Sequence, residues 1–329
     1  MTDRAQGFAP TASWENLRAR ARLLARIRRF FDARGFLEVE TPLLSHDTVV
    51  DHHLEPLAVR LIHDPSDVGD GPWLWLQTSP EFGMKRLLAA GATAIYQITR
   101  AFRGGERGPL HNPEFTMVEW YRTGDDMRSG MRLLDELAQE TLCRGSAEQV
   151  SYSEAFRRRL GIDPHRCSTA DLARSAREHG FDGSASWDPD DRDAWLDWLL
   201  ATCIEPTLGA ERPTIVFDYP ASQAALACVR AEPQPVAERF ELYVNGVELA
   251  NGYHELTDAS VLRRRTVLAN QARLADGRAR LPEDSRLLAA MQYGLPPCTG
   301  VALGFDRLVM VAVGARRLDD VMAFPIEHA

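Results

Sequence analysis

The chain has 329 residues, of which 45% are hydrophobic and 26% are charged. This composition is ordinary for a folded globular protein, and it excludes wholesale disorder, a collagen-like repeat and a small disulfide scaffold. The net charge is −9, from 47 acidic and 38 basic residues. It argues against tight nonspecific binding to nucleic acid, which depends on basic patches that neutralise phosphates.

The sequence also indicates where the protein works. It contains no run of about 18 apolar residues, so no membrane span is predicted. Five cysteines, an odd number, form no CxxC pair: Cys143, Cys167, Cys203, Cys228 and Cys298. This pattern predicts thiols in the reducing cytoplasm rather than a disulfide framework.

The first predicted elements follow a short N-terminal tail of residues 1–12. Ser13 is a suitable helix cap, and apolar residues then recur at three- and four-residue spacing. They predict a helix of about five turns that ends at Gly35. The alternating run at residues 36–41 predicts a strand that Pro42 stops.

In the middle of the chain, a region of predicted strands is followed by a predominantly helical region. Residues 73–77 predict a buried strand and residues 80–88 a helix. Residues 94–102 and 113–121 predict two strands joined by a glycine-rich polar loop. Helical periodicity then runs through residues 124–212, which predicts a helical insert in the domain.

Strand signals return in the last third. Asn245-Gly246 between two β-rich runs is a strong hairpin signal. The other predicted elements are a strand at 213–219, helical structure at 258–293, a strand at 300–304 and a helix from Asp306 to Val313. Strands and helices without regular alternation predict an α+β fold around an antiparallel sheet flanked by helices.

Five segments carry the chemistry. The first is the helix with the strand ending at Pro42, the second runs from Arg100 to Tyr121, and the third from Gly300 to Leu308. These resemble, in order, the three signature motifs of class II aminoacyl-tRNA synthetases. Residues 78–87 and 241–256 are similar to the amino-acid loop and the metal and amino-acid segment of the lysyl branch. The resemblance covers nearly all of residues 13–329, as one synthetase-like catalytic domain.

The resemblance implies that ATP and Mg²⁺ take part and that the protein is a homodimer built on the first motif. Joining a carboxylate to the α-phosphate of ATP brings two anions together, so cations must offset their repulsion. Arg103 would bind the α-phosphate and Arg307 the γ-phosphate, both as catalytic residues. Glu241 and Glu248 would bind Mg²⁺, which prefers oxygen ligands. The further ATP contacts implied are Gly104, Gly105, Glu106, His111, Asn112, Phe115, Glu248, Leu249 and Gly304.

Three acids in apolar or aromatic surroundings suggest the amino-acid substrate. Buried carboxylates are costly unless they are paired, and a substrate with two amino groups would pair them. By resemblance, Glu255 with Tyr121 would bind the distal ammonium, and Glu81 with Glu119 the amine nearer the carboxylate. The other substrate contacts implied are Ser79, Pro80, Asn251 and Ala302.

One position departs from the family pattern. The lysyl branch usually has Glu two residues after the arginine of the second motif, but here that position is Gly105. We expect Glu106 to read the adenine amino group instead, after a small shift of the loop.

An expected absence of an anticodon-binding domain favours one group of paralogues over lysyl-tRNA synthetases. A lysyl-tRNA synthetase of this type has an anticodon-binding domain before the first motif, and we expect none here. The resemblance then indicates the paralogues that activate (R)-β-lysine and transfer it to the ε-amine of a lysine on elongation factor P (EF-P). Lysyl-tRNA synthetases typically carry Ala and Gly where this chain has Ser79 and Ala302. Such changes are worth about 1–3 kcal/mol each, so they predict a preference for β-lysine over α-lysine rather than exclusion.

Two alternatives remain open. A truncated lysyl-tRNA synthetase would still charge tRNA, although tRNA binding is not expected. A catalytically inactive, synthetase-like regulator would bind a partner or sense lysine, and Gly105 is its best support. Retention of Arg103, Arg307, Glu241 and Glu248 argues against the regulator.

Overall fold

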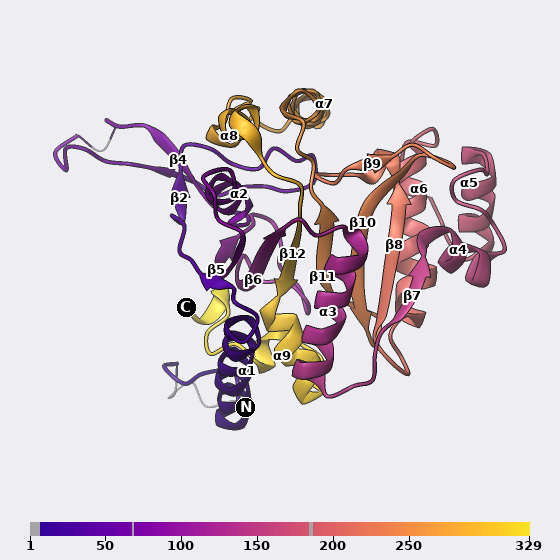
Figure 1. Ribbon diagram of the computed structural model, residues 1–329, viewed down its shortest axis with the longest axis horizontal. Helices are drawn as coiled ribbons and strands as arrows, with labels where there is room; N and C mark the ends of the chain where they lie inside the picture. The colour runs from indigo at the N-terminus through magenta and orange to yellow at the C-terminus, as the bar shows by residue number, and fades with distance from the viewer. Residues whose placement is uncertain (1–6, 68, 184–186) are drawn as a thin grey trace. The chain divides into compact units, whose positions relative to one another are not determined.

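The computed structural model describes residues 7–67, 69–183 and 187–329. The chain divides into two compact units, a first unit of Met1–Asp125 with Leu256–Ala329 and a second unit of Asp126–Glu255. Each combines β-strands with helices, so the predicted α+β class is confirmed (Figure 1). Within the described ranges, no helix is long and apolar enough to cross a membrane. The predicted tail of residues 1–12 falls partly outside the described residues.

The sheet of the first unit surrounds one central strand. The strand order is β1–β5–β6–β12, parallel between β1 and β5 and antiparallel elsewhere. The strands are β1 (Leu37–Glu38), β5 (Ala94–Phe102), β6 (Glu114–Thr123) and β12 (Cys298–Gly304). Residues 116–121 of β6 are all buried, because β6 has a neighbour on both sides.

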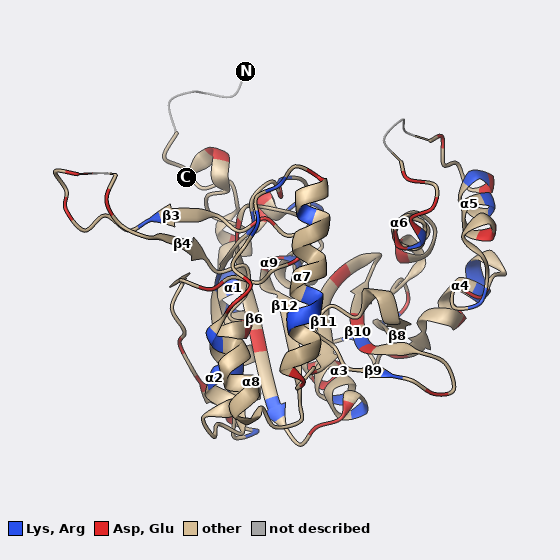
Figure 2. Cartoon of the chain, turned by 90° about the horizontal axis from the view of Figure 1, so that it is seen from above, with Lys and Arg blue, Asp and Glu red and all other residues tan. Residues whose placement is uncertain are grey.

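Helices and a small sheet complete the first unit. The helices are α1 (Trp14–Asp32), α2 (Glu81–Ala89), α7 (Ala259–Ala275), α8 (Arg286–Gly294) and α9 (Phe305–Val313), with 3-10 turns at Leu318–Asp320 and Ile326–His328. The small sheet has the order β2 (Leu44–Ser45), β4 (Trp73–Leu76), β3 (Ala58–Arg60). The loop that joins β3 to β4 carries Asp64, Asp67 and Asp70, which are exposed (Figure 2).

Helix α1 forms as its sequence predicts. The Ser13 hydroxyl accepts a hydrogen bond from the backbone N–H of Asn16, and the buried stripe of α1 ends at Phe31. The Phe31 ring stacks on Tyr96, with 4.6 Å between ring centroids. The strand predicted at 36–41 is shorter, because only Leu37–Glu38 pairs with β5 before the chain turns away toward Pro42.

The helical region predicted at 258–293 is two helices rather than one. Helix α7 ends at Ala275, and Gly277 takes a left-handed conformation with φ of 74°. The Asn270 side chain then holds the loop by bonding both the N–H and the C=O of Leu281. Helix α8 begins at Arg286, where the Ser285 hydroxyl caps it by accepting a hydrogen bond from the Leu288 N–H.

The second unit is built on four strands in the order β11–β10–β8–β7, with β9 paired to β10. The strands are β7 (Glu148–Ser151), β8 (Thr214–Pro220), β9 (Val229–Arg230), β10 (Val236–Val244) and β11 (Val247–His254). The helices are α3 (Met127–Leu142), α4 (Tyr152–Leu160), α5 (Thr169–Glu178) and α6 (Arg192–Leu199), with short helical turns at Leu200–Ile204, Glu205–Thr207 and Ala221–Gln223. The predicted helical insert therefore contains one strand, β7, whose pairing with the distant β8 has no local sequence signal.

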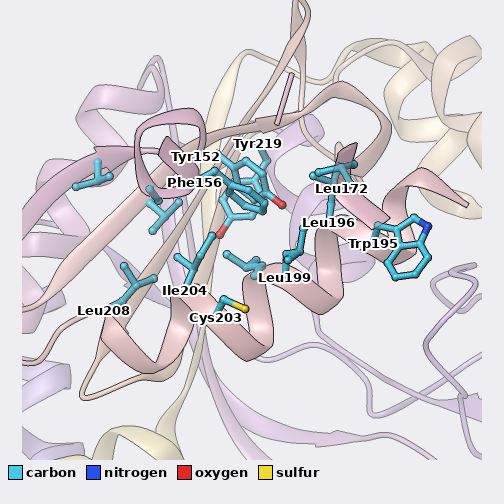
Figure 3. Packing of buried hydrophobic residues seen from close by; sticks show 14 of the residues in the cluster. Tyr152, Phe156, Leu172, Trp195, Leu196, Leu199, Cys203, Ile204, Leu208 and Tyr219 are labelled. Carbon is cyan, nitrogen blue, oxygen red and sulfur yellow. The ribbon is translucent and has the colours of Figure 1, made fainter. Parts of the chain in front are cut away.

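The helices of the second unit enclose an apolar core (Figure 3). Tyr152 stacks on Phe156 at 4.6 Å and lies 4.8 Å from the Tyr219 ring, measured between centroids. Trp195 and Leu196 of α6 extend the cluster, and both are fully buried. Burial of large aromatic and aliphatic side chains is the main source of stability here.

The predicted Asn245-Gly246 turn joins β10 to β11. Both residues have positive φ, 53° and 73°, as this type of hairpin turn requires. Gly209 packs directly against the end of β10, and its carbonyl accepts a hydrogen bond from the Asn245 N–H. Its own φ is +70°, and a Cβ there would come within 2.4 Å of the Tyr243 carbonyl oxygen.

This contact generates a stability prediction. Gly209→Ala should lower the free energy of unfolding by about 3 kcal/mol, because a left-handed alanine would also collide with backbone. Gly161→Ala is the matched control, with the same φ and no atom within 4 Å of the new Cβ. It should cost only about 1 kcal/mol. Equal losses for the two variants in urea unfolding would contradict the assigned packing.

Candidate active site

Glu119 is the central acid of the first unit. It lies in the middle of β6, paired across the ladders with Gln97 of β5 and Ala302 of β12. Only 1% of its surface is exposed. Paired residues of an antiparallel ladder have neighbouring side chains, so the Ala302 methyl lies next to the Glu119 side chain.

Two hydroxyl groups hold the Glu119 carboxylate. Tyr121 donates to Oε1 at 2.6 Å, and Ser79 donates to Oε2 at 2.8 Å. The Ser79 oxygen also accepts from the backbone N–H of Glu81 at 3.0 Å. Ser79 therefore connects the first turn of α2 to the central strand.

Glu81 is a second buried acid close to Glu119, and it forms an ion pair within its own helix. Lys85 lies one turn later on α2, and its Nζ is 2.5 Å from Oε1 of Glu81. Both side chains are buried. We call Ser79, Glu81, Lys85, Glu119 and Tyr121 the carboxylate cluster.

Burial raises the pKa of Glu119 to about 7, and the negative charge of Glu81 acts in the same direction. The hydrogen bonds from Tyr121 and Ser79 and the charge of Lys85 lower it, but they do not offset the burial. Near neutral pH this carboxyl group exists in both protonation states. A cationic amine placed beside it would favour the ionised state.

The loop after β5 carries Arg103. Its guanidinium lies over the Phe115 ring, 5.1 Å from the centroid, and 3.8 Å from Oε1 of Glu106. The Arg103 Nε is buried and has no hydrogen-bond partner. An unsatisfied buried donor on a cation is suited to an anionic ligand.

Two glycines shape this loop. The Gly104 N–H donates to the carbonyl of Glu55 at 2.7 Å, and a Cβ at Gly104 would lie 3.3 Å from that oxygen. Gly105 has φ of +77°, which a residue with a side chain rarely adopts. At the position where glutamate is usual in the lysyl branch, the backbone conformation thus favours glycine.

Arg307 approaches the same loop from the start of α9. Its NH2 lies 2.7 Å from Nε2 of His111, and its Nε donates to the Leu110 carbonyl. Burial lowers the pKa of His111, and the charges of Arg307 and Arg103 lower it further, so the ring is neutral at pH 7 and accepts this hydrogen bond. Arg307 contacts His111, and the positive charge of Arg103 acts on the same ring, so this region can attract a polyanion.

The second unit holds the predicted metal ligands. Glu241 is buried, and its Oε2 accepts hydrogen bonds from Tyr219 and Tyr243 at 2.5 Å each. Arg239 binds Oε1 at 2.5 Å. Burial and the Glu241 charge raise the pKa values of both tyrosines well above their usual range, so both remain donors.

The donor set of this hairpin fits Mg²⁺. Across β10 and β11, Glu241 pairs with Asn251 and Tyr243 with Glu248, which places all four on one face. A carboxylate offers about four lone-pair sites, and Glu241 uses three of them. The buried Asn251 Oδ1 has no hydrogen-bond partner. Among the described residues, no group of three or more His, Cys, Asp or Glu side chains could hold a metal ion. Mg²⁺ usually binds one or two carboxylates together with substrate phosphates.

Two further predicted residues lie on or just after β11. Glu255 is buried, and its backbone carbonyl accepts a hydrogen bond from the Cys228 thiol. Leu249 is buried with the apolar residues of this unit. It lies between Glu248 and Ala250, where the β10–β11 register shifts.

Comparison with known proteins identifies the family. The family model described as "tRNA synthetases class II (D, K and N)" matches residues 4–328. The chain belongs to the class II tRNA synthetases.

Several relatives of this chain share the name elongation factor P–(R)-β-lysine ligase. The protein of that name from Pectobacterium atrosepticum is 48% identical over 322 residues, covering 98% of each chain. That from Yersinia enterocolitica is 47% identical over 328 residues, covering 98% of this chain and all of its own. That from Edwardsiella ictaluri is 48% identical over 329 residues, covering both chains fully.

The site residues predicted for this class II synthetase fall into both units. The first unit brings Ser79, Glu81, Glu119 and Tyr121 together, and it also brings Arg103, Glu106, His111, Phe115 and Arg307 together. The second unit brings Glu241, Glu248 and Asn251 to one face of its hairpin. Asn112 is buried, and its side chain bonds the backbone of Glu114 and Ile326, so it supports the loop.

Sequence reasoning missed three supporting residues. Lys85 lies within the motif at residues 78–87, and its place four residues after Glu81 on a predicted helix is the signal for an ion pair. Asp306 accepts a hydrogen bond from the Thr116 N–H and pairs with Arg20 of α1, which fixes the start of α9 beside β6. Its position directly before Arg307 was the available signal.

The raised pKa of Glu119 generates a stability prediction. A carboxyl group whose pKa is higher in the folded state than its ordinary 4.5 binds a proton on folding, so wild-type stability falls as the pH rises from 4.5 to above 7. Glu119→Gln removes this dependence. The unfolding free energy of the variant, relative to wild type, should increase by about 3 kcal/mol between pH 4.5 and pH 8.

Urea unfolding of both proteins across this pH range measures the difference. Glu178→Gln, at an exposed position of α5, is the control and should show no such trend. A pH-independent difference between Glu119→Gln and wild type would contradict the raised pKa.

Proposed function

We propose that this protein activates (R)-β-lysine with ATP and transfers the β-lysyl group to the ε-amine of a lysine on EF-P. The observation that carries the proposal is the match, at 48% identity over 98–100% of the chain, to relatives named elongation factor P–(R)-β-lysine ligase. The carboxylate cluster and the two arginines of the first unit supply binding groups for an amine and for a polyphosphate.

In the first step a carboxylate oxygen of β-lysine attacks the α-phosphorus of ATP. An O–P bond forms, the bond to the β-phosphate breaks, and pyrophosphate leaves. Arg103 stabilises the charge at the α-phosphate through its fork of donors, and Arg307, held by neutral His111, binds the γ-phosphate. Glu241 and Glu248 would hold Mg²⁺, which neutralises phosphate charge when bound.

The amino groups of the substrate fix its orientation. Ionised Glu119 binds one of them within the carboxylate cluster. The Ala302 methyl beside Glu119 limits the space next to this amine, which supports a preference for the β isomer. The energy involved is about 1–3 kcal/mol, so α-lysine is a slower substrate rather than an excluded one.

In the second step the neutral ε-amine of the EF-P lysine attacks the carbonyl carbon of the adenylate. A C–N bond forms, the C–O bond to the phosphate breaks, AMP leaves, and the amine loses a proton. The reaction takes place in the cytoplasm, which fits a chain whose five cysteines are all thiols.

The test is the intact mass of unmodified EF-P after incubation with this protein, Mg-ATP and either lysine isomer. EF-P should gain one lysyl unit, faster with (R)-β-lysine than with α-lysine. Arg103→Ala should reduce the rate by about a hundredfold or more, since it removes a phosphate ligand. Arg166→Ala, with a largely exposed side chain, is the control and should leave the rate unchanged.

Other outcomes distinguish the alternatives. Amino-acid-dependent ATP–pyrophosphate exchange without any mass gain on EF-P would move the acceptor to tRNA. No exchange with either isomer would favour an inactive regulator.

We also propose that the protein is a homodimer through α1 and β1. Trp14 is 67% exposed and Leu37 is 64% exposed, so both apolar side chains are accessible to a second copy of the chain. Light scattering should give about twice the chain mass of 36.8 kDa at micromolar concentration. A mass of one chain would contradict the dimer.

A further inference from the structure

Lys85 is an exception in the composition of this chain. The sequence has 38 basic residues, and all except Lys85 are arginines. This single lysine is only 2% exposed, whereas lysine is almost never fully buried without a partner. Its neighbour Arg86, on the same helix, is exposed. A buried ammonium at one position of an arginine-using chain requires a reason in its surroundings.

Those surroundings are two acids. The Lys85 Nζ is 2.5 Å from Oε1 of Glu81. Glu81 in turn bonds Ser79 through its N–H, and Ser79 bonds Glu119. The charge of Lys85 also acts on Glu119, where it opposes the effect of Glu81. Lys85 therefore belongs electrostatically to both carboxylates.

The charged groups of the carboxylate cluster do not balance. Two buried carboxylates and one ammonium leave a deficit of one positive charge. Burial is the main cause of the raised pKa of Glu119, and the negative charge of Glu81 raises it further. One ammonium group of the substrate would bring the net charge of the cluster to zero, and a second ammonium would make it positive.

We propose that Lys85 is a positioning residue that occupies one oxygen of Glu81 and limits the cluster to a single ammonium of the substrate. The proposal rests on the amino-acid activation proposed above and deepens it, because it assigns one amine of a diamino acid to this cluster. The other amine must bind outside it. Lysine suits this task better than arginine, because an ammonium is a compact point charge and a guanidinium needs a planar, two-oxygen partner.

Removing the charge should change how the cluster titrates. The groups that face Glu119 are Glu81 and Lys85 from α2, Ser79 from the preceding loop, Tyr121 on its own strand, and neutral Gln97 and Ala302 on the flanking strands. Among these described groups Lys85 carries the positive charge, and it lowers the pKa of Glu119. Without it, Glu119 stays protonated to higher pH and loses its attraction for the substrate amine there.

The experiment is amino-acid-dependent ATP–pyrophosphate exchange with Lys85→Ala. The KM for the amino acid should rise by about tenfold, while the KM for ATP stays unchanged. Added n-propylammonium replaces the deleted part of the side chain, charge included, and should restore the KM. 1-Propanol has the same size without the charge and should not restore it. Arg86→Ala, from the same helix, is the control and should behave as wild type.

A second variant, Lys85→Met, keeps the role of Lys85 testable if Lys85→Ala does not fold. Lys85→Met keeps the alkyl stem and removes the charge, and the acid limb of kcat/KM for the amino acid should move up by about one pH unit. The proposal is overturned by an unchanged KM in Lys85→Ala, by equal rescue with 1-propanol, or by an unmoved acid limb in Lys85→Met.

The two proposals fail in different ways. No exchange in the wild-type protein with either lysine isomer contradicts the proposed function. The role of Lys85 is then decided by unfolding in urea, since the pH-dependent loss of wild-type stability caused by Glu119 should shift to higher pH in Lys85→Met. An unshifted profile overturns the role of Lys85 independently of any substrate.

Discussion

A carboxylate in the middle of a sheet is the constraint on which the first unit depends. Glu119 occupies the central strand β6, where the neighbouring positions are buried as well. Such a group is costly to bury unless it is hydrogen-bonded and balanced in charge. Tyr121, Ser79 and the Glu81–Lys85 pair provide part of this balance and leave a deficit that a substrate amine can fill.

The same strand also organises the phosphate side of the unit. The chain leaves β5 into the Arg103 loop and returns as β6, so the loop is anchored at both ends to one ladder. Asp306 binds the backbone of Thr116 on β6, and this contact fixes the start of α9 and therefore Arg307. The proposed amine-binding and phosphate-binding groups of this unit are therefore anchored to the same strand.

The loop of Arg103 also shows features of this particular chain. Gly105 takes a left-handed conformation, and Arg107 pairs with Glu327 and Asp319 near the C-terminus. The Leu318 N–H bonds the Pro109 carbonyl, so the C-terminal segment supports the loop through backbone as well. In this way the loop is ordered by contacts remote in sequence, although it lacks the glutamate that is usual in the lysyl branch.

The sequence by itself determined the family, the α+β class, helix α1, the β5–β6 pair and the Asn245-Gly246 turn, because these depend on local caps, periodicity and turn residues. It also named Glu81, Glu119, Arg103 and Arg307. Only the tertiary structure decided that Lys85 neutralises Glu81, that Arg20 and Asp306 fix the position of Arg307, and that β7 pairs with β8 inside the predicted helical insert. Charge balance and strand pairing depend on residues that become neighbours only when the chain folds. Local sequence patterns therefore do not predict them.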